Sequence, residues 1–250
     1  MSVGVAVVVV VAVLLGTALQ RVAGMGLGLV AAPLLSIVLG PLAGVTMSNV
    51  AAATAAVALM IILRADIDWH RFAGVAPLLI VGSAVGAWVV RVVDTGVLDV
   101  VLGASVLIAI AAALGLQRHL NVTGRLPAVT SGAVAGFMNT TAGVAAPAMT
   151  VYAVASRWDQ RSMAATLQPV FLLANLASIL TKAIAGATPA PGVVPWWGWV
   201  VAVAGVPLGI ALGTVLARRV DLSTARTVAI VVATAGGVVA LIRGLVSLLA

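Results

Sequence analysis

Long runs of apolar residues are the feature that most constrains the fold of this chain. About 20 consecutive apolar residues form a helix that spans a bilayer, whereas membrane β-strands alternate apolar and polar residues. The runs here are continuous, and 63% of all residues are hydrophobic while 8% are charged. We therefore expect an all-α polytopic membrane protein without a soluble domain. The expected helices cover residues 3–20, 25–40, 44–63, 73–91, 97–116, 127–142, 144–156, 162–182, 195–217 and 226–248.

Two of these segments are interrupted by glycine and proline. Residues 21–35 read RVAGMGLGLVAAPLL and residues 136–149 read GFMNTTAGVAAPAM, so GLVAAP aligns with GVAAP when Pro147 is placed on Pro33. A helix break at membrane depth is tolerated only where protein or a polar cavity satisfies the freed backbone groups. This pattern predicts a membrane transporter whose substrate site lies near mid-membrane, where the two broken segments meet.

The positive charges favour one arrangement of the helices, because cytoplasmic loops accumulate Lys and Arg. With four crossings in each half, the 13 Lys and Arg residues divide seven to six, whereas with five crossings they divide ten to three. The second division leaves only Arg91, Lys182 and Arg243 on the outer side. It predicts a multi-pass protein of the cytoplasmic (inner) membrane with both termini extracytoplasmic. The charges leave open whether segments 25–40 and 144–156 cross fully or are re-entrant.

An odd number of crossings in each half makes the two halves inverted repeats. A second pair of similar stretches supports the duplication: LLIVGSAVGAWVVRVVD at 78–94 resembles GVPLGIALGTVLARRVD at 205–221. Both contain small residues four apart, which let helices approach closely. The predicted organisation is a first membrane repeat at 1–117, a cytoplasmic linker at 118–126 and a second membrane repeat at 127–250, each repeat having about five helical segments.

The residue inventory argues against an enzyme. The chain has no glutamate and no cysteine, and its six aspartates all fall in loops or at helix ends. It contains no metalloprotease motif, no Gly-x-Ser-x-Gly sequence and no phosphate-binding Walker A sequence. The positive charges are scattered and form no nucleic-acid patch. We therefore expect no catalytic residue, cofactor, metal site or nucleic-acid partner.

Neutral polar residues at membrane depth are the candidates for substrate binding. The strongest group is Asn139-Thr140-Thr141 beside the second break, which either binds substrate or caps the half-helix that follows. Half-helix N-termini expose N–H groups that suit an anion, and the absence of an acidic partner also favours an anion over a cation. H⁺ and Na⁺ are candidate coupling ions, and the oligomeric state is unknown. The predicted substrate-binding residues are Arg21, Gly24, Gly26, Gly28, Asn49, Asn139, Thr140, Thr141, Gln168 and Asn175, and Gln20 is a further amide at depth.

Several of these motifs resemble the TauE/SafE (sulfite exporter, TSUP) family of bacterial membrane permeases. The resemblance rests on GMGLGLVAAPLL and AGFMNTTAGVAAPAM, on Thr46 and Thr166 in the helices that follow, and on GSAVGA at 82–87. It covers nearly the whole chain as a duplicated unit. The resemblance implies transport of sulfite, an organosulfonate or a related small organic anion across the cytoplasmic membrane, usually outward.

Two alternatives have different structural signatures. A drug or metabolite carrier with five-plus-five inverted repeats would have nearly all of its helices at full length. A non-transporting membrane subunit would have a closed, dry interior in which every polar group is bonded internally.

Overall fold

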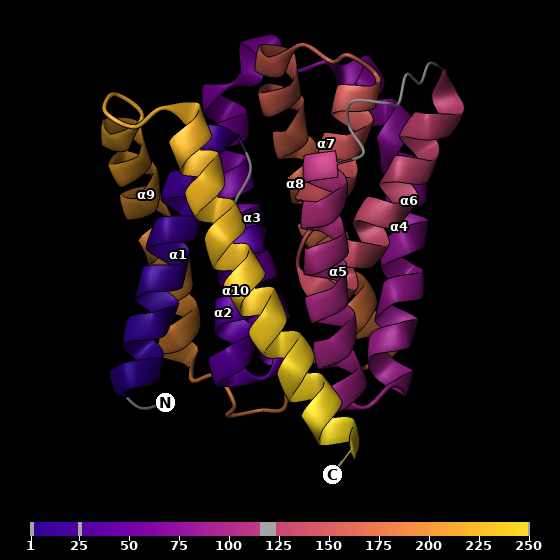
Figure 1. Cartoon of the computed structure of the whole chain (residues 1–250), viewed down its shortest axis with the longest axis vertical. Coiled ribbons are helices and arrows are strands. Elements are labelled where there is room, and N and C mark those ends of the chain that lie inside the picture. Colours follow the sequence, from indigo (N-terminus) through magenta and orange to yellow (C-terminus); the bar gives the residue numbers. More distant parts are fainter. Residues whose placement is uncertain (1–2, 25–26, 116–123, 250) are drawn as a thin grey trace.

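The computed structural model describes residues 3–24, 27–115 and 124–249, and these form ten α-helices, one short 3-10 turn at Arg64–Asp66, and no strand (Figure 1). The predicted residue Gly26 and most of the predicted linker at 118–126 lie outside the described residues. The all-α prediction is therefore confirmed. The helices are α1 (Val3–Ala23), α2 (Leu27–Leu39), α3 (Pro41–Ile62), α4 (Trp69–Val92), α5 (Thr95–Gly115), α6 (Arg125–Ala142), α7 (Ala146–Ala155), α8 (Gln160–Ala185), α9 (Trp196–Leu216) and α10 (Leu222–Leu249).

Six helices in the described part of the chain are long and apolar enough to cross a membrane, judged by length and composition. Their outward faces are covered by exposed apolar side chains such as Leu208, Val231 and Ile242. Such surfaces are stable in lipid and not in water. These features show a multi-pass membrane protein. The six segments are Gly4–Ala23, Pro41–Ile62, Trp69–Val92, Gln160–Ala185, Trp196–Leu216 and Ser223–Leu249.

Helices α2 and α7 are too short to span a bilayer. They contain 13 and 10 residues, which correspond to about 20 Å and about 15 Å at 1.5 Å per residue. The hydrocarbon core is about 30 Å thick. In Figure 1, α2 lies in the lower half of the molecule and α7 in the upper half. Each short helix therefore begins inside the protein and runs towards the opposite end from the other.

Helix α8 forms the centre of the bundle and packs against both α3 and α4. In its most apolar 18-residue window 67% of the residues are buried, the largest share among the six candidate spans. Its first turn is stabilised by Asp159, whose Oδ2 accepts hydrogen bonds from the N–H groups of Arg161 and Ser162, both at 3.0 Å. This is the capping chemistry expected at a helix N-terminus. Because most of α8 is buried, the polar residues on this helix lie inside the protein.

Glycines allow two pairs of helices to make backbone contact. A Cβ added at Gly136 of α6 would stand 2.0 Å from the Leu79 carbonyl oxygen of α4, and one at Gly82 would stand 2.0 Å from the Ala133 carbonyl oxygen. Helices α1 and α9 meet in the same manner, since a Cβ at Gly213 would stand 2.7 Å from the Ala18 carbonyl oxygen. The small-residue stretches predicted from the sequence therefore do lie at helix contacts.

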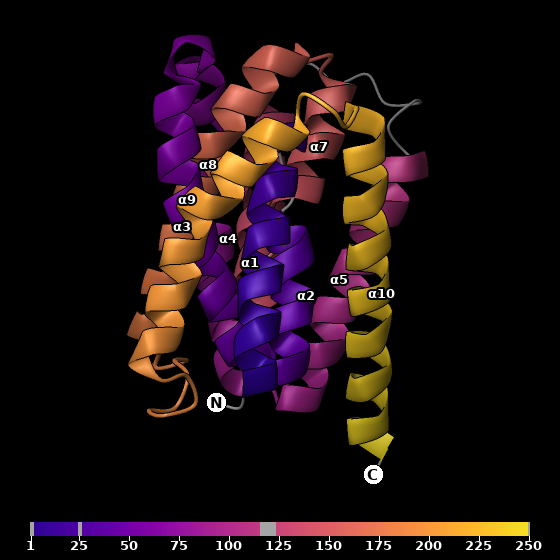
Figure 2. The same cartoon turned by 90° about the vertical axis from the view of Figure 1, so that its left-hand side faces the viewer.

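The far end of α2 is stabilised by an ion pair from two other helices. Arg243 of α10 donates to both carboxylate oxygens of Asp99 on α5, at 2.7 and 2.6 Å. The same guanidinium donates to the carbonyl oxygens of Ser36 and Ile37 in the last turn of α2, at 2.9 Å each. Figure 2 shows α10 running beside α5. The guanidinium thus bonds the Ile37 carbonyl at the end of the helix and adds a second hydrogen bond to the Ser36 carbonyl, which also accepts from the Gly40 N–H at 3.0 Å.

Candidate functional site

The two broken segments meet inside the protein. A Cβ added at Gly28, in the first turn of α2, would stand 2.2 Å from the carbonyl oxygen of Gly143, which lies between α6 and α7. Gly143 has φ 74°, a left-handed conformation that favours glycine. Its N–H donates to the Asn139 carbonyl oxygen at 3.0 Å and ends α6. Only glycine at position 28 allows this approach, so the break pattern in the sequence produces a contact between the halves.

A small cavity lies at this contact. Its volume is ≈ 20 Å³, and a cavity needs about 10–15 Å³ to hold one water molecule. The space fits a single water and is too small for an oxyanion. A substrate can occupy this place only after the helices around it move apart. The lining residues are Gln20, Leu27, Gly28, Leu29, Ala52, Asn139, Gly143, Val144, Ala145, Ala146, Phe171 and Asn175.

Two half-helices begin at the cavity wall. Leu27 and Gly28 open α2, while Ala145 is the N-cap of α7 and makes no side-chain capping bond. The first N–H groups of a helix have no partner inside that helix, and they carry its partial positive charge. The cavity is therefore bordered by two sources of positive potential.

The Asn139-Thr140-Thr141 group does not cap α7, which decides one alternative left open by the sequence. Asn139 Nδ2 donates across to Asn175 Oδ1 of α8 at 3.0 Å, and both amides line the cavity. Thr141 Oγ1 donates to the Phe137 carbonyl oxygen of its own helix at 2.9 Å. Thr140 lies against α4, and its buried hydroxyl has no partner in the described part of the chain. Of the three, only Asn139 reaches the cavity.

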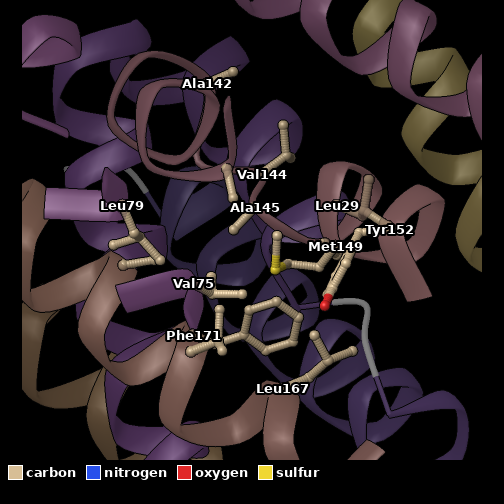
Figure 3. Close-up of a cluster of buried hydrophobic side chains, with 14 of the residues drawn as sticks. Leu29, Val75, Leu79, Ala142, Val144, Ala145, Met149, Tyr152, Leu167 and Phe171 are labelled. Atoms are coloured by element: carbon tan, nitrogen blue, oxygen red, sulfur yellow. The ribbon is translucent and has the colours of Figure 1, made fainter. Parts of the chain in front are cut away.

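Apolar side chains surround the remaining space. Figure 3 shows Val144 and Ala145 from the second break near Met149 of α7, with Phe171 of α8 directed towards the same interior. All of these residues are less than one-tenth exposed. Such surroundings strengthen the interaction of a charged ligand with the few dipoles present.

A wider hollow of ≈ 400 Å³, which we call the vestibule, lies next to the cavity. Gln20 lines both spaces, and its Nε2 donates to Gln168 Oε1 at 3.1 Å. Gln168 Nε2 is held in turn by the carbonyl oxygens of Ala164 at 2.8 Å and Gly24 at 3.3 Å. The two glutamines therefore form a neutral partition between the vestibule and the cavity.

The charges of the vestibule come from the ends of α1 and α8. Arg21, Asp159 and Arg161 line it, and Arg161 forms an ion pair with Asp66 at 2.9 Å. The buried Nε of Arg21 has no hydrogen-bond partner among the described residues. Arg21 is therefore a cation available at the vestibule, and it does not line the inner cavity.

The predicted site residues thus fall into separate places. Gly28, Asn139 and Asn175 line the cavity, whereas Arg21, Gly24 and Gln168 line the vestibule. Asn49 lies at the contact of α3 with α8, where its Nδ2 donates to Ser178 Oγ at 2.6 Å and its buried Oδ1 has no described partner.

Two polar residues were missing from the sequence-based site. Gln20 forms the partition, although the sequence marked it only as an amide at depth. Lys182 was assigned to the outer charges but is 2% exposed inside the protein. The seven-residue spacing of Gln168, Asn175 and Lys182 places all three on one face of α8, and this spacing was the signal for both the partition and the buried lysine.

A further hollow of ≈ 570 Å³ lies elsewhere, among α4, α6 and α7. It is lined by His70, Arg71 and Arg125 among others, and it touches neither helix break. The described residues contain no cluster of three or more His, Cys, Asp or Glu side chains that could hold a metal ion.

Comparison with known proteins gives one match. The family model described as "Sulfite exporter TauE/SafE" matches residues 8–240. No curated protein and no solved structure matched the chain.

Proposed function

Because the chain belongs to the sulfite exporter TauE/SafE family, we propose that it exports sulfite or an organosulfonate through the cavity where the two helix breaks meet. Membership of this family makes the chain a membrane transporter and not an enzyme, and it implies a small anionic substrate. The identity of the anion, the direction of transport and the binding residues are the proposed parts.

The observation that carries the proposal is the convergence of two half-helix N-termini and two amides on one small cavity. Gly28 and Ala146 bring backbone N–H groups to it, and Asn139 and Asn175 bring side-chain amides. No aspartate lines the cavity. Uncharged N–H donors in an apolar surround bind an anion without holding it as tightly as a fixed charge would. The proposed central site therefore recognises the negative oxygens of the substrate.

Movement of the anion requires the two halves to part on one side at a time. The proposed halves are the inverted repeats 1–117 and 127–250. Three observations support this relation: α2 and α7 run towards opposite ends, α4 packs on α6, and α9 packs on α1. The last two contacts correspond because residues 78–94 resemble 205–221. Rocking of the halves about Gly28 and Gly143 would open the cavity first to the vestibule and then to the other end.

The proposed orientation places the vestibule on the cytoplasmic side, with both termini outside. The loops before α4, before α8 and before α10 contribute Arg64, Arg157 and Arg219 to the vestibule end, which agrees with the accumulation of Arg in cytoplasmic loops. Export of an anion from a cell whose interior is negative is favoured by about 2.3 kcal/mol for each charge and each 100 mV of membrane potential. Export of this kind needs no coupling ion, although H⁺ or Na⁺ could couple at the neutral site.

Efflux from proteoliposomes tests this function. Purified protein is reconstituted with internal radiolabelled sulfite, and efflux is followed at a membrane potential set by potassium and valinomycin. We expect saturable efflux that quickens when the compartment holding sulfite is negative. Asn139→Asp should lower it at least tenfold because the new carboxylate repels the anion, whereas Thr130→Ala, on an exposed position of the same helix, should not. Absence of efflux for sulfite and for a panel of organosulfonates would refute the proposal.

The structure weighs against the two alternatives. A drug or metabolite carrier was expected to have nearly all helices at full length, yet α2 and α7 have 13 and 10 residues. A structural subunit was expected to have every interior polar group bonded, yet Thr140 Oγ1 and Asn49 Oδ1 have no partner in the described residues.

A further inference from the structure

Lys182 is a buried lysine near the end of α8 that lies away from the vestibule. The residue is 2% exposed, and its Nζ donates a hydrogen bond to Thr46 Oγ1 of α3 at 3.1 Å. An ammonium group has three N–H donors. No other hydrogen bond of this group is found among the described residues, so two donors are left for another ligand.

The chain contains no side-chain carboxylate that pairs with Lys182. It has no glutamate, and all six aspartates lie in the described part of the chain. The ion pairs found there join Arg71 to Asp68, Arg161 to Asp66 and Arg243 to Asp99. Burying a cation without a counter-ion is costly. The chain thus supplies no counter-ion to Lys182, and an anion that reaches it from outside the chain would take that place.

The position of Lys182 on α8 connects it to the central cavity. At 100° per residue, the side chains of Gln168, Asn175, Ser178 and Lys182 lie within an arc of about 80° on one face of the helix. The distance along the axis from Gln168 to Lys182 is about 21 Å at 1.5 Å per residue. All four side chains are buried.

This polar stripe passes each feature of the proposed route in order. Gln168 stands at the vestibule partition, Asn175 lines the cavity, and Ser178 accepts a hydrogen bond from Asn49 one turn before Lys182. Arg21 supplies a positive charge at the vestibule end. The neutral cavity thus lies between two basic side chains, Arg21 and Lys182, that have no ion-pair partner in the described residues.

We propose that Lys182, held by Thr46, is a second anion-binding residue, which takes the oxyanion from the central cavity on its way to the outer end of the protein. The proposal rests on the anion transport proposed above. A neutral central site binds weakly, and a cation further along the route attracts the anion onward. Conduction through successive sites requires each to bind strongly enough for entry and weakly enough for release. The Thr46 hydroxyl holds the Lys182 amine and leaves the other N–H donors of that amine for the substrate.

Substitution of Lys182 separates a role in transport from a role in stability. Lys182→Met leaves an unbranched side chain that is one atom shorter and removes the amine, so we expect an unfolding temperature in detergent equal to or above that of the parent protein. Sulfite efflux from proteoliposomes should fall at least tenfold. Lys182→Arg keeps the charge and should retain efflux within about threefold of the parent protein. Arg91→Met removes an exposed cation near the same end and should leave efflux unchanged.

The possible outcomes distinguish the role proposed for Lys182 from the transport function on which it rests. Efflux by Lys182→Met at the parent rate would overturn the role of Lys182 while leaving the transport function standing. A lower unfolding temperature of Lys182→Met would also overturn it, because the amine would then be stabilising the fold. Equal losses in Lys182→Met and Lys182→Arg would show that the charge is not what matters. If the parent protein moves no anion at all, the proposed function fails first.

Discussion

Substitution of Gly28 by alanine tests the contact between the two helix breaks. The added methyl group would stand 2.2 Å from the Gly143 carbonyl oxygen, whereas carbon atoms in contact are about 3.5 Å apart or more. The breaks must therefore separate by about 1 Å. Overpacking of this kind costs about 1–3 kcal/mol, and the obstacle is backbone that cannot rotate away. Alanine in a helix otherwise gains about 1 kcal/mol over glycine, so the net cost is about 0–2 kcal/mol.

The assay compares Gly28→Ala with Gly74→Ala, where the added methyl would meet only the Ala128 side chain at 3.6 Å. We expect Gly74→Ala to unfold at or above the parent temperature in detergent. Gly28→Ala should unfold at a lower temperature than Gly74→Ala by about 2–4 °C for each kcal/mol that separates them. Sulfite efflux should fall about tenfold in Gly28→Ala alone. If the two variants match in both unfolding temperature and efflux, the contact at the breaks does not exist as described.

Three other substitutions have outcomes that follow from the packing. Arg243→Met leaves Asp99 buried without its partner and should cost about 3 kcal/mol in unfolding free energy; an unchanged unfolding temperature would contradict the stabilising role of the pair. Gln20→Ala removes half of the partition between the vestibule and the cavity. In an Asn175→Cys variant, whose cysteine is the only one in the chain, this change should speed labelling by a thiol reagent about tenfold. Equal labelling rates would place the barrier elsewhere. Gly136→Ala puts a methyl 2.0 Å from a carbonyl oxygen of α4 and should destabilise the protein by about 1–3 kcal/mol, seen as a lower unfolding temperature.

Several properties of the molecule follow directly from local sequence. Lipid replaces water around the chain, so every spanning segment must be apolar and satisfy its own backbone, and continuous apolar runs therefore predicted the helices. The predicted segment 127–142 corresponds to α6, which begins at Arg125 and ends at Ala142. Glycine and proline act within their own turn of the chain, so the breaks that follow Ala23 and Ala142 could also be placed.

The candidate site could be predicted only in part. Asn139 and Asn175 were chosen because amides are costly to bury without partners, and the structure brings the two together on the cavity wall. Thr140 was chosen for its position beside Asn139, but successive residues of a helix point 100° apart, and Thr140 faces α4 instead. Closeness in sequence to a helix break therefore did not indicate which side chain reaches the cavity.

The sequence by itself determined the membrane class, the helical content and the location of the two breaks, because each depends on apolar length and backbone chemistry within a few residues. Only the tertiary structure decided which polar groups have partners. Gln20 meets Gln168 across 148 residues of chain, and Lys182 is buried against Thr46 across 136. From sequence alone, a lysine near the end of an apolar helix is expected to be a charge at the membrane–water interface. It becomes a buried lysine here because α3 and α8 pack together around it.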